Sequence, residues 1–561
     1  MELKGAEILI NCLKEEGVDI IFGYPGGQAL PVYDALYDSD INHILVRHEQ
    51  GAVHAADGYA RATGKVGVCL ATSGPGATNL ITGIANAFMD SIPLVCFTGQ
   101  VSTFLIGHDA FQEADIIGIT LPITKHSFMA DKTENIAAII KKAFYIARTN
   151  RPGPVLVDLP RDVMEKVIEY KPAKTEVNIK GYRVMKGFNS GQVLAAVESI
   201  KEAQKPVLYI GGGIIISGAA DQLLELAEKR KIPVAATLMG LSGFPGDHYL
   251  SLGMLGMHGT RYANYAISDC DLLIAAGVRF DDRVTGKLDT FAPSAKVIHI
   301  DVDAAEVGKN VAVDVPIVGD VKEVLSAINK KLSPLEEKTL WCQTTENWKR
   351  EYPLRYKSPD DSASIMPQYV IEKINELTAG QAIITTEVGQ HQMWAAQYYK
   401  FVHPRSFITS GGLGTMGFGF PAAIGAKLAF PDVPVIDIAG DGSIQMNIQE
   451  LGTAMNYNIP VIVCILNNQF LGMVRQWQSL FYQGRYSYTD ISHQPDFVKL
   501  AEAYGAVGLR AEKKDEVESV LRQALAVKDR PVLIDFRVER EENVYPMVPP
   551  GGSLLNMLGG E

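Results

Sequence analysis

The chain has 561 residues, too many for one hydrophobic core, so about two to four domains are expected. Apolar residues make up 47% and charged residues 21%, as in ordinary soluble globular proteins. The net charge of −12 and the scattered basic residues argue against a nucleic-acid or membrane-surface role, which needs a basic stripe.

The N-terminus, residues 1–18, predicts an amphipathic helix without the basic segment and apolar core of a signal peptide. The most apolar stretches, such as 460–466, are far too short to span a bilayer. The cysteines show no CxxC spacing and several lie in apolar runs, so we expect reduced, buried thiols. These features predict a cytoplasmic protein that neither enters a membrane nor binds nucleic acid.

Short apolar runs that end in Gly, Asp or Asn alternate with helical patterns along the chain. Such runs are typical of buried parallel strands, and their alternation with helices predicts βα units. We therefore expect an α/β protein of doubly wound parallel sheets. The predicted strands lie within residues 66–74, 92–99, 153–159, 205–213, 270–277, 295–303, 382–389, 433–442 and 460–468.

Two polar, charged segments without a strand pattern, 166–188 and 332–365, are interpreted as linkers. They divide the chain into three α/β domains of similar size. The predicted domains are 1–165, 189–331 and 366–540, followed by a tail at 541–561 that is rich in Pro and Gly. We expect the tail to close over a site as a lid, and a frayed terminus is the alternative.

The turn Gly-Asp-Gly at 440–442 follows a predicted strand and precedes a helix predicted over 444–458. Such turns bind phosphate through backbone N–H groups, and the Asp441 carboxylate would repel it unless a cation lies between them. Asn468 ends the next predicted strand, and adjacent strand ends line one crevice. Asp441 and Asn468 then suit Mg²⁺, although a capped turn and an unremarkable Asn pair explain either half alone.

A formal dinucleotide fingerprint, Gly412-x-Gly414-x-x-Gly417, precedes this turn, with Asp437 further along. Asp437 lies in the strand that leads to the Gly-Asp-Gly turn, so these residues suit the metal–phosphate motif better. The motif consists of Gly-Asp-Gly, followed after about two dozen residues by Asn-Asn. It matches the diphosphate motif of thiamine-diphosphate enzymes. In those enzymes this loop holds the aminopyrimidine, and Met416 would prop the cofactor in its bent form; a core filler is the alternative.

Glu49 ends a predicted strand and opens an Ala-rich helix. As an acidic residue in a first helical turn it needs no further role. In a thiamine enzyme it has another task, because a carboxyl group on the pyrimidine N1′ lets the cofactor's own imino group take up its C2 proton. The glycine-rich stretches 23–27 and 72–76 in the same domain permit a close approach of cofactor or substrate.

The whole chain resembles the catalytic large subunits of the acetolactate synthase (acetohydroxyacid synthase) family. The matching stretches fall in all three domains: FGYPGG, RHEQGAVHAADGYARATG, DAFQEAD, RPGPVLVDLPRD, LGMLGMHGTRYANYAI, RFDDRVTG, GDGSIQMNIQEL, LNNQFLGMVRQWQ and the tail. The resemblance implies a pyrimidine-binding, a central FAD-binding and a diphosphate-binding domain, in chain order.

The resemblance also implies the residues that bind each cofactor. Thiamine diphosphate is activated by Glu49 and bound by Gly26, Gln390, His391, Gly414, Met416, Gly440, Gly442 and Ser443. Mg²⁺ is bound by Asp441, Asn468 and the backbone carbonyl of Phe470. FAD, with no net redox role, is bound by Arg151, Gly211, Gly212, Gly213, Met257, His258, Gly277, Arg279 and Asp301. Without the resemblance, the FAD residues suit only a generic nucleotide site, and ordinary strand-end chemistry is the alternative.

Two positions govern substrate choice in the resembling family. Trp477 matches a tryptophan that shapes the pocket for the second 2-keto acid, and Arg283 matches the cation that meets its carboxylate. The alternatives are a buried aromatic anchor for Trp477 and a surface ion pair with Asp281 or Asp282 for Arg283.

Gln112, next to Phe111, matches residues that line the same cavity. Arg161 stands where the family commonly has Lys; it keeps the charge but is not an equivalent group. Ser102 replaces a frequent proline in a loop that lines an access channel in the family, which bears on inhibitor sensitivity.

The implied reaction decarboxylates pyruvate on thiamine diphosphate and transfers the hydroxyethyl unit to a second 2-keto acid. Pyruvate gives 2-acetolactate and 2-ketobutyrate gives 2-aceto-2-hydroxybutyrate, precursors of branched-chain amino acids. Because the family takes Glu49 and Asp441 from two subunits, a homodimer or dimer of dimers is implied, with a small regulatory subunit as a further partner. The alternatives are a flavin-active pyruvate oxidase, an FAD-free catabolic acetolactate synthase and a non-catalytic nucleotide-binding regulator.

Overall fold

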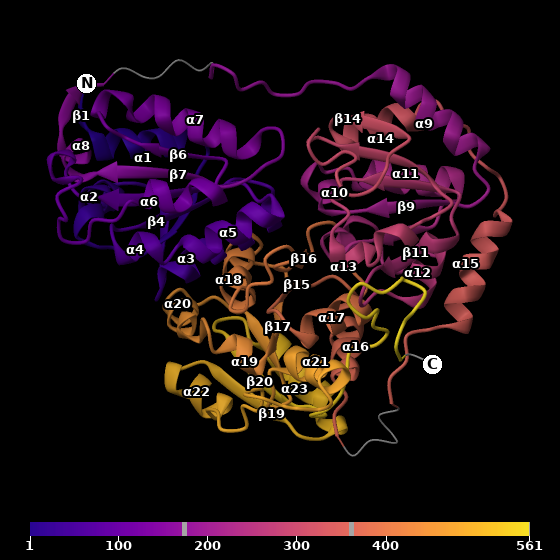
Figure 1. Ribbon diagram of the computed structural model, residues 1–561. Helices are drawn as coiled ribbons and strands as arrows, with labels where there is room; N and C mark the ends of the chain where they lie inside the picture. The colour runs from indigo at the N-terminus through magenta and orange to yellow at the C-terminus, as the bar shows by residue number, and fades with distance from the viewer. Residues whose placement is uncertain (171–176, 358–363, 560–561) are drawn as a thin grey trace.

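The computed structural model describes residues 1–170, 177–357 and 364–559. They form three α/β units, each built around a six-stranded parallel sheet. In Figure 1 the first unit (indigo) and the second (magenta) lie side by side above the third (orange to yellow). The predicted fold class, α/β with doubly wound parallel sheets, is confirmed. Within these residues, no helix combines the length and the apolar character needed to cross a bilayer.

The first sheet has the strand order β3-β2-β4-β5-β7-β6. Its strands are β2 (Ile20–Gly23), β3 (Asn42–Leu45), β4 (Gly67–Ala71), β5 (Leu94–Gln100), β6 (His126–Met129) and β7 (Val155–Pro160). Its helices are α1 (Gly5–Glu15), α2 (Leu30–Tyr37), α3 (Glu49–Thr63), α4 (Pro75–Thr78), α5 (Ile81–Asp90), α6 (Ile116–Thr120), α7 (Ile136–Arg148) and α8 (Arg161–Glu165). The order reverses between β2 and β4, which is where a crevice forms in an open parallel sheet.

The third sheet has the order β16-β15-β17-β18-β20-β19. Its strands are β15 (Ile383–Thr386), β16 (Phe407–Ile408), β17 (Val435–Gly440), β18 (Ile462–Asn467), β19 (Val507–Ala511) and β20 (Val532–Arg537). Its helices are α16 (Pro367–Thr378), α17 (Gln390–Tyr398), α18 (Gly419–Ala429), α19 (Asp441–Ile444), α20 (Leu451–Asn456), α21 (Gly472–Phe481), α22 (Phe497–Tyr504) and α23 (Lys514–Ala526). Counted along each unit, the first and third sheets share the order 2-1-3-4-6-5.

The second sheet differs, with the order β11-β10-β9-β12-β13-β14. Its strands are β9 (Pro206–Ile210), β10 (Val234–Ala236), β11 (Ser251–Met254), β12 (Leu272–Ala276), β13 (Lys296–Asp301) and β14 (Val315–Val318). Its helices are α9 (Ser190–Glu202), α10 (Gly212–Ile216), α11 (Ala220–Arg230), α12 (Arg261–Asp269), α13 (Asp282–Thr285) and α14 (Val321–Asn329). Counted along the unit this order is 3-2-1-4-5-6, the dinucleotide-binding arrangement, which reverses between β9 and β12.

Each of the predicted strands is present, as β4, β5, β7, β9, β12, β13, β15, β17 and β18. All of them are inner strands, and nearly all their side chains are buried. The edge strands β6, β11, β14 and β19 are only partly buried and lack the continuous apolar run on which the prediction depends. The inner strands β2, β10 and β20 are also absent from the prediction; β10 has only three residues.

Both predicted linkers contain regular elements. The segment 166–188 includes β8 (Val167–Glu169), which pairs antiparallel with β1 (Glu2–Lys4). The N-terminal helix therefore begins only at Gly5, after a strand that the helix prediction does not include. In the segment 332–365, α15 (Leu340–Glu351) buries its Trp341, whose indole N–H donates to the Pro206 carbonyl at 3.0 Å. Residues 171–176 and 358–363 of these segments lie outside the described residues.

The described part of the tail packs on the second unit. Val548 and Leu554 join the hydrophobic core of that unit, and the Val548 N–H donates to the Met257 carbonyl at 2.7 Å. The tail also contacts α21, where the Gln476 side chain donates to the Val544 carbonyl at 3.1 Å. The frayed-terminus alternative is therefore wrong for these residues, and the role of a lid stays a prediction.

The helices α3 and α18 join the first unit to the third within one chain (Figure 1). A Cβ atom at Gly58 would strike the Ala422 backbone, and one at Gly425 would strike the Ala55 carbonyl. Glycine at these positions lets the two helix backbones approach closely. The contact fixes the strand-end loops of the two units relative to each other.

Candidate functional site

Asp441 lies at the carboxyl edge of the third sheet, directly after β17. It is 1% exposed, and its Oδ2 has no hydrogen-bond partner among the described residues. Burial raises the pKa of this carboxyl to about 7. Since a buried, unpartnered carboxylate oxygen is costly unless a cation or a proton meets it, the position fits the predicted metal ligand.

The asparagine pair emerges from β18, the neighbour of β17. The Asn468 Nδ2 donates to the Gln390 Oε1 at 3.2 Å, and its Oδ1 accepts the Phe470 N–H at 3.1 Å. Asn467 turns away, and its Nδ2 donates to the Asp535 carboxylate at 2.8 Å. The two asparagines therefore differ: Asn468 contacts predicted site residues, and Asn467 belongs to a supporting network.

Gln390 and His391 open α17, which follows β15, the other neighbour of β17. His391 packs against Gly440, where a Cβ would collide with the imidazole. Burial lowers the pKa of His391 to about 3, so the ring is neutral. The Ser443 hydroxyl accepts the Gly440 N–H at 3.3 Å and closes the turn that contains Gly442. The structure thus gathers the predicted diphosphate residues at one edge.

The prediction of one continuous helix over 444–458 is wrong, because the structure divides this segment. α19 ends at Ile444, a 3₁₀ turn covers Ile448–Glu450, and α20 covers Leu451–Asn456. The interruption includes Asn447, whose Nδ2 donates to the Gly417 carbonyl at 2.6 Å. The interruption therefore ties the turn after β17 to the loop that contains Gly414 and Met416.

The loop before α18 is an arch that is fixed at both ends. Two backbone N–H groups at its start donate to Asp90, at 3.1 and 2.7 Å, and the Gly417 N–H donates to Glu387 at 2.6 Å. Between these ends, Gly414 and Met416 make no backbone hydrogen bond within the described residues. Their N–H and C=O groups are available to a ligand, which fits the predicted aminopyrimidine contact.

Asp437, the acid of the formal dinucleotide fingerprint, is fully buried inside the third sheet. Its Oδ1 accepts the Thr385 hydroxyl at 3.0 Å, and Glu387 lies close by. Burial raises the pKa of both carboxyl groups, and their proximity opposes ionisation of both together. Asp437 is thus placed in the core and not at a ribose, in agreement with the choice of the other motif.

Glu49 is the first residue of α3, as the sequence predicts, and the His48 side chain caps the helix. It is 9% exposed, and its Oε2 accepts the Asn79 Nδ2 at 2.9 Å. Gly76 of α4, which follows β4, lies close to its Oε1, and Gly26 of the loop after β2 lies against Thr72. Glu49 therefore lies at the reversal point of the first sheet.

Gly211 and Gly213 follow β9, and Gly277 follows β12, on either side of the reversal point of the second sheet. A Cβ at Gly211 or Gly213 would strike the Gly277 backbone. The Gly211 N–H donates to the Ala276 carbonyl and the Gly213 N–H to the Gly277 carbonyl, both at 3.1 Å. These glycines allow the segments after β9 and β12 to pack closely, and Gly212 has no such bond among the described residues.

Three charged residues, Arg151, Arg279 and Asp301, are also predicted to bind FAD. Asp301 ends β13, and burial raises the pKa of its carboxyl to about 6. Arg151 extends from the first unit to the second and donates to Glu306 at 2.8 Å. Arg279 extends in the opposite direction and donates to the Met89 carbonyl at 2.6 Å. Both arginines thus join the first unit to the second.

Met257 and His258 lie at the same edge of the second sheet. The Met257 N–H donates to the Arg283 carbonyl at 2.8 Å, which connects this segment to the predicted substrate residue. His258 is buried, its Nδ1 has no partner among the described residues, and burial lowers its pKa to about 4. A buried ring nitrogen without a partner marks a place where a ligand can supply one.

The structure brings Arg283 and Trp477 together. The guanidinium carbon lies 5.9 Å from the centroid of the Trp477 ring, a cation–π contact. Arg283 also lies 3.8 Å from Asp282, so the ion-pair alternative is present as a second contact. Trp477 is only partly buried and packs edge-on against Phe481.

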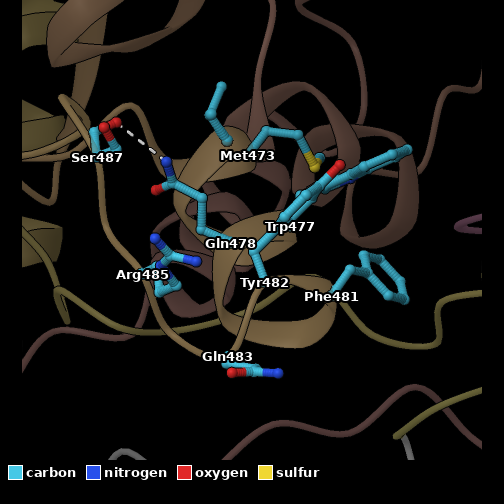
Figure 2. Close-up of a pocket in the computed structure, with 9 residues that line it drawn as sticks. Met473, Trp477, Gln478, Phe481, Tyr482, Gln483, Arg485 and Ser487 are labelled. Atoms are coloured by element: carbon cyan, nitrogen blue, oxygen red, sulfur yellow. Dashed lines mark hydrogen bonds between the residues drawn. The ribbon is translucent and has the colours of Figure 1, made fainter.

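A hollow of about 730 Å³ opens along α21. Figure 2 shows Met473, Trp477 and Phe481 on the helix that lines it, with the Gln478 side chain held by the Ser487 carbonyl at 3.0 Å. The hollow combines an apolar wall with the cation of Arg485, and Trp477 in that wall contacts Arg283. An apolar wall with cations beside it suits a small 2-keto acid.

Gln112 and Arg161 lie on the first unit. Gln112 has a positive φ of 61° and its backbone packs on Gly74. Arg161 opens α8 and pairs with Glu165 at 2.8 Å, with its side chain partly exposed. These contacts lie within the first unit, so the chain by itself does not join the two residues to Trp477.

Several residues that hold the site are not among those predicted from the sequence. Asn79, Asp90, Glu387 and Glu450 support Glu49 or the Met416 loop through hydrogen bonds across loops or units. Only Glu387 carries a signal, as an acid at the carboxyl end of a predicted strand. The other three lie in ordinary helical patterns.

Three thiamine pyrophosphate enzyme models match the chain: the N-terminal TPP binding domain at residues 3–119, the central domain at 193–328 and the C-terminal TPP binding domain at 387–536. The chain is 53% identical to a probable acetolactate synthase large subunit of Methanocaldococcus jannaschii, over 99% of this chain and 95% of that protein. It is 50% identical to the acetolactate synthase isozyme 3 large subunit of Escherichia coli, over 99% of this chain and 98% of that protein. The acetolactate synthase large subunit of Haemophilus influenzae gives the same values.

The matched models cover most of the chain and part of each of the three sheets, and the relatives match it nearly from end to end at half identity or more. The chain therefore belongs to the thiamine-diphosphate-dependent enzymes, in the family of acetolactate synthase large subunits.

Proposed function

We propose that the protein decarboxylates pyruvate and joins the remaining two-carbon unit to a second 2-keto acid, forming 2-acetolactate or 2-aceto-2-hydroxybutyrate. The observation that carries this proposal is the start of α21, where Gly472 lies against Asn468 and Gln390. From this point the helix leads to Trp477 and its cationic neighbour Arg283. One edge of the third sheet thus unites diphosphate-type residues with a pocket suited to a 2-keto acid.

For Mg²⁺ we propose the ligands Asp441, Asn468 and the Phe470 carbonyl. The buried Oδ2 of Asp441, without a partner among the described residues, is the atom that a cation satisfies, and hard oxygen ligands suit Mg²⁺. The bond from the Phe470 N–H to Asn468 holds these two residues in one turn. The cation lets a diphosphate approach the glycine turn despite the carboxylate.

Thiamine diphosphate, when bound, supplies the electron sink for decarboxylation and for carbon–carbon bond formation. We assign to Glu49 the hydrogen bond to the pyrimidine N1′, a task that needs a buried carboxyl at a fixed position. Asn79 provides that fixation by donating to Oε2, so Oε1 remains for the ring. Gly414 and Met416 would face the ring with backbone groups that have no backbone hydrogen-bond partner among the described residues.

For the second 2-keto acid we propose recognition by Arg283 and Trp477. The planar guanidinium matches a carboxylate with two parallel hydrogen bonds. The indole limits the side chain that fits beside the keto group. We place Gln112 and Arg161 at the same pocket, contributed by the first unit of a second copy.

We propose a homodimer, or a dimer of dimers. Within one chain, Glu49 contacts Asn79 of the first unit and Asp441 contacts Gln445 of the third unit, so a second copy is needed to bring the two acids to one cofactor. Large apolar side chains are exposed on the first and the third unit: Phe111 is 84% and Met446 52% exposed. Such side chains mark a surface that a second copy can cover. The relatives are named large subunits, which supports a smaller regulatory chain as a further partner.

For FAD we propose the carboxyl edge of the second sheet, with no net redox role. The support is the sheet's dinucleotide-binding order, the acid Asp301 at the end of β13 and the unpartnered Nδ1 of His258 among the described residues. Arg151 and Arg279 already hold other partners, which favours a role in fixing the cradle between two units.

The test supplies the purified protein with pyruvate, thiamine diphosphate and Mg²⁺, with and without FAD, and measures acetolactate, CO₂ and flavin absorbance. We expect one CO₂ per acetolactate, an oxidised flavin throughout and a yellow protein. Flavin reduction in step with decarboxylation would show a pyruvate oxidase instead. A colourless protein with full activity would show an FAD-free acetolactate synthase.

A further inference from the structure

Glu450 of the third unit reaches into the first unit and holds the turn that precedes Glu49. Its Oε1 accepts the Arg47 N–H at 3.1 Å and the His48 N–H at 3.0 Å. Its Oε2 accepts the Thr453 hydroxyl at 2.6 Å, which fixes the carboxylate from its own unit. The side chain is 1% exposed. The approach of the chain to α3 is therefore set by an acid that is more than 400 residues away.

Asp90, the last residue of α5 in the first unit, reaches into the third unit. One carboxylate oxygen accepts the Gly411 N–H at 3.1 Å, and the other accepts the Gly412 N–H at 2.7 Å. Arg61 donates to Asp90 at 2.9 Å and balances its charge. The start of the loop that leads to Met416 thus rests on an acid of another unit.

Asn86 and Asp57 complete this buried network. The Asn86 Oδ1 accepts the hydroxyls of Ser410 at 2.6 Å and of Thr415 at 3.2 Å, and its Nδ2 donates to Asp57 at 3.0 Å. The partners of Asp57, Arg61 and Asn86, both belong to the first unit. Asp57 therefore belongs to the same network as Asp90, but it reaches the loop only through Arg61 and Asn86.

The two contacts occupy equivalent places in the two units, which share one strand order. Glu450 and Asp90 each lie on the segment after the third strand of their own unit, β17 and β4. Glu450 accepts hydrogen bonds from the segment after β3, the second strand of the first unit. Asp90 accepts them from the segment after β16, the second strand of the third unit. Between them, α3 and α18, also equivalent, pack on each other. The relation is reciprocal, so it is a property of the interface and not of one isolated bond.

We infer that Glu450 and Asp90 are positioning residues of a reciprocal clamp: Glu450 sets Glu49 for its contact with the cofactor pyrimidine, and Asp90 sets the Met416 loop. The inference rests on the functions proposed above for Glu49 and Met416. In the proposed dimer these two elements of one chain serve different active sites. The clamp therefore orders one half of each site from within a single chain.

The Asp90 arm is tested with D90N, and D57N is its matched control. D90N keeps one acceptor oxygen and turns an NH₂ group toward a backbone N–H, so one loop bond is lost. D57N changes the same Arg61 network without touching the loop. We expect the Kd of thiamine diphosphate at saturating Mg²⁺, read by tryptophan fluorescence, to rise about tenfold in D90N and less than about twofold in D57N. If the Kd rises equally in both variants, or rises only as far as Tm falls, the role of Asp90 is overturned.

The Glu450 arm is tested with E450A, and E450Q is the conservative variant. The readout is hydrogen–deuterium exchange at C2 of thiamine diphosphate bound at saturation, quenched and measured by NMR. We expect exchange to slow about tenfold in E450A, because the turn before Glu49 loses its acceptor, and to stay within about twofold in E450Q, which retains one. Since exchange is measured with the cofactor at saturation, weaker binding does not change the measured exchange rate. Unchanged exchange in E450A, or equal slowing in both variants, overturns the role of Glu450.

A second variant covers the case in which D90N does not fold. S410A removes the hydroxyl that donates to Asn86 and accepts the Thr415 N–H at 2.8 Å. It is expected to raise the Kd several-fold at a Tm close to wild type, and an unchanged Kd contradicts the clamp. A wild-type protein that binds no thiamine diphosphate contradicts the proposed function itself, whereas wild-type binding together with unchanged variants contradicts the clamp alone.

Discussion

The first and third sheets share one strand order, yet the loops at their carboxyl edges carry different chemistry. After the third strand, the third unit has the acid Asp441 between two glycines, whereas the first unit has the uncharged stretch 72–76. After the second strand, the first unit has the acid Glu49, whereas the third has the glycine-rich loop that contains Met416. The fold thus supplies equivalent positions, and the residues placed there decide between proton chemistry and metal–phosphate chemistry.

The comparison is tested most strongly by Glu49→Gln. If the first unit supplies the proton chemistry, kcat for acetolactate falls about 10²–10³-fold, because general acid–base catalysis contributes on that scale. The Kd of Mg²⁺ stays as in wild type. The measurement is steady-state kinetics at saturating cofactor, with E323Q, an exposed acid in the first turn of α14, as the control. A loss of activity that excess Mg²⁺ restores would contradict the division of labour between the sheets.

The reverse outcome is expected for Asp441→Asn in the third unit. The variant loses the charge that meets the cation, so the apparent Kd of Mg²⁺ rises about tenfold to a hundredfold. Saturating Mg²⁺ recovers much of kcat. Metal titrations of activity and of thiamine diphosphate binding check this, with D432N, an exposed acid before β17, as control. An unaltered Mg²⁺ requirement in D441N speaks against the metal assignment.

The adjacent asparagines Asn467 and Asn468 test the metal assignment within the third unit. Asn468→Ala is expected to weaken Mg²⁺ binding about tenfold with little change in Tm. Asn467→Ala is expected to lower Tm, because it leaves the buried Asp535 carboxylate short of a partner, with a smaller effect on Mg²⁺. Thermal unfolding and metal titration of both variants decide the matter. The opposite pattern would exchange the roles of the two residues.

The smallest effect concerns pH at the contact between the two units. Burial raises the pKa of Glu450 from 4.5 to about 7, so the folded protein holds this proton more tightly than the unfolded chain. The stability that the group contributes is therefore full at low pH and is lost as pH rises from about 4.5 to about 7. Between pH 6 and pH 8, wild type should lose about 1.4 kcal/mol more free energy of unfolding than E450Q. Parallel pH dependence of the two proteins would contradict this assignment.

The inner strands could be predicted from the sequence because each is buried on both faces and reads as an apolar run, as in β4 and β18. The partly buried edge strands, such as β6, give no such signal. The turn with Asp441 and the helix start at Glu49 follow local rules, so their positions could also be predicted. The interruption at Asn447 could not, because it depends on a carbonyl in a loop 30 residues earlier.

The supporting residues lie beyond sequence reasoning for a different reason. Glu450 and its partner His48 are 402 residues apart, and no local pattern distinguishes Glu450 from an ordinary helical acid. Asn467 and Asn468 look equivalent in the sequence, and only their neighbours in space separate them. The glycines 211–213 have the composition of a phosphate loop, although two of their N–H groups bond to the β12 strand and the loop after it.

In the proposed dimer, Glu49 of one chain and Asp441 of another act on the same cofactor. This arrangement is tested by mixing the inactive variants E49Q and D441A, letting subunits exchange, and measuring acetolactate formation. In a mixed dimer, one site receives both substitutions and the other receives neither, so random exchange restores about a quarter of wild-type activity. If both residues acted from the same chain, no mixed dimer would contain an intact site. Activity that stays at the level of the separate variants would show that the two residues do not act from different chains.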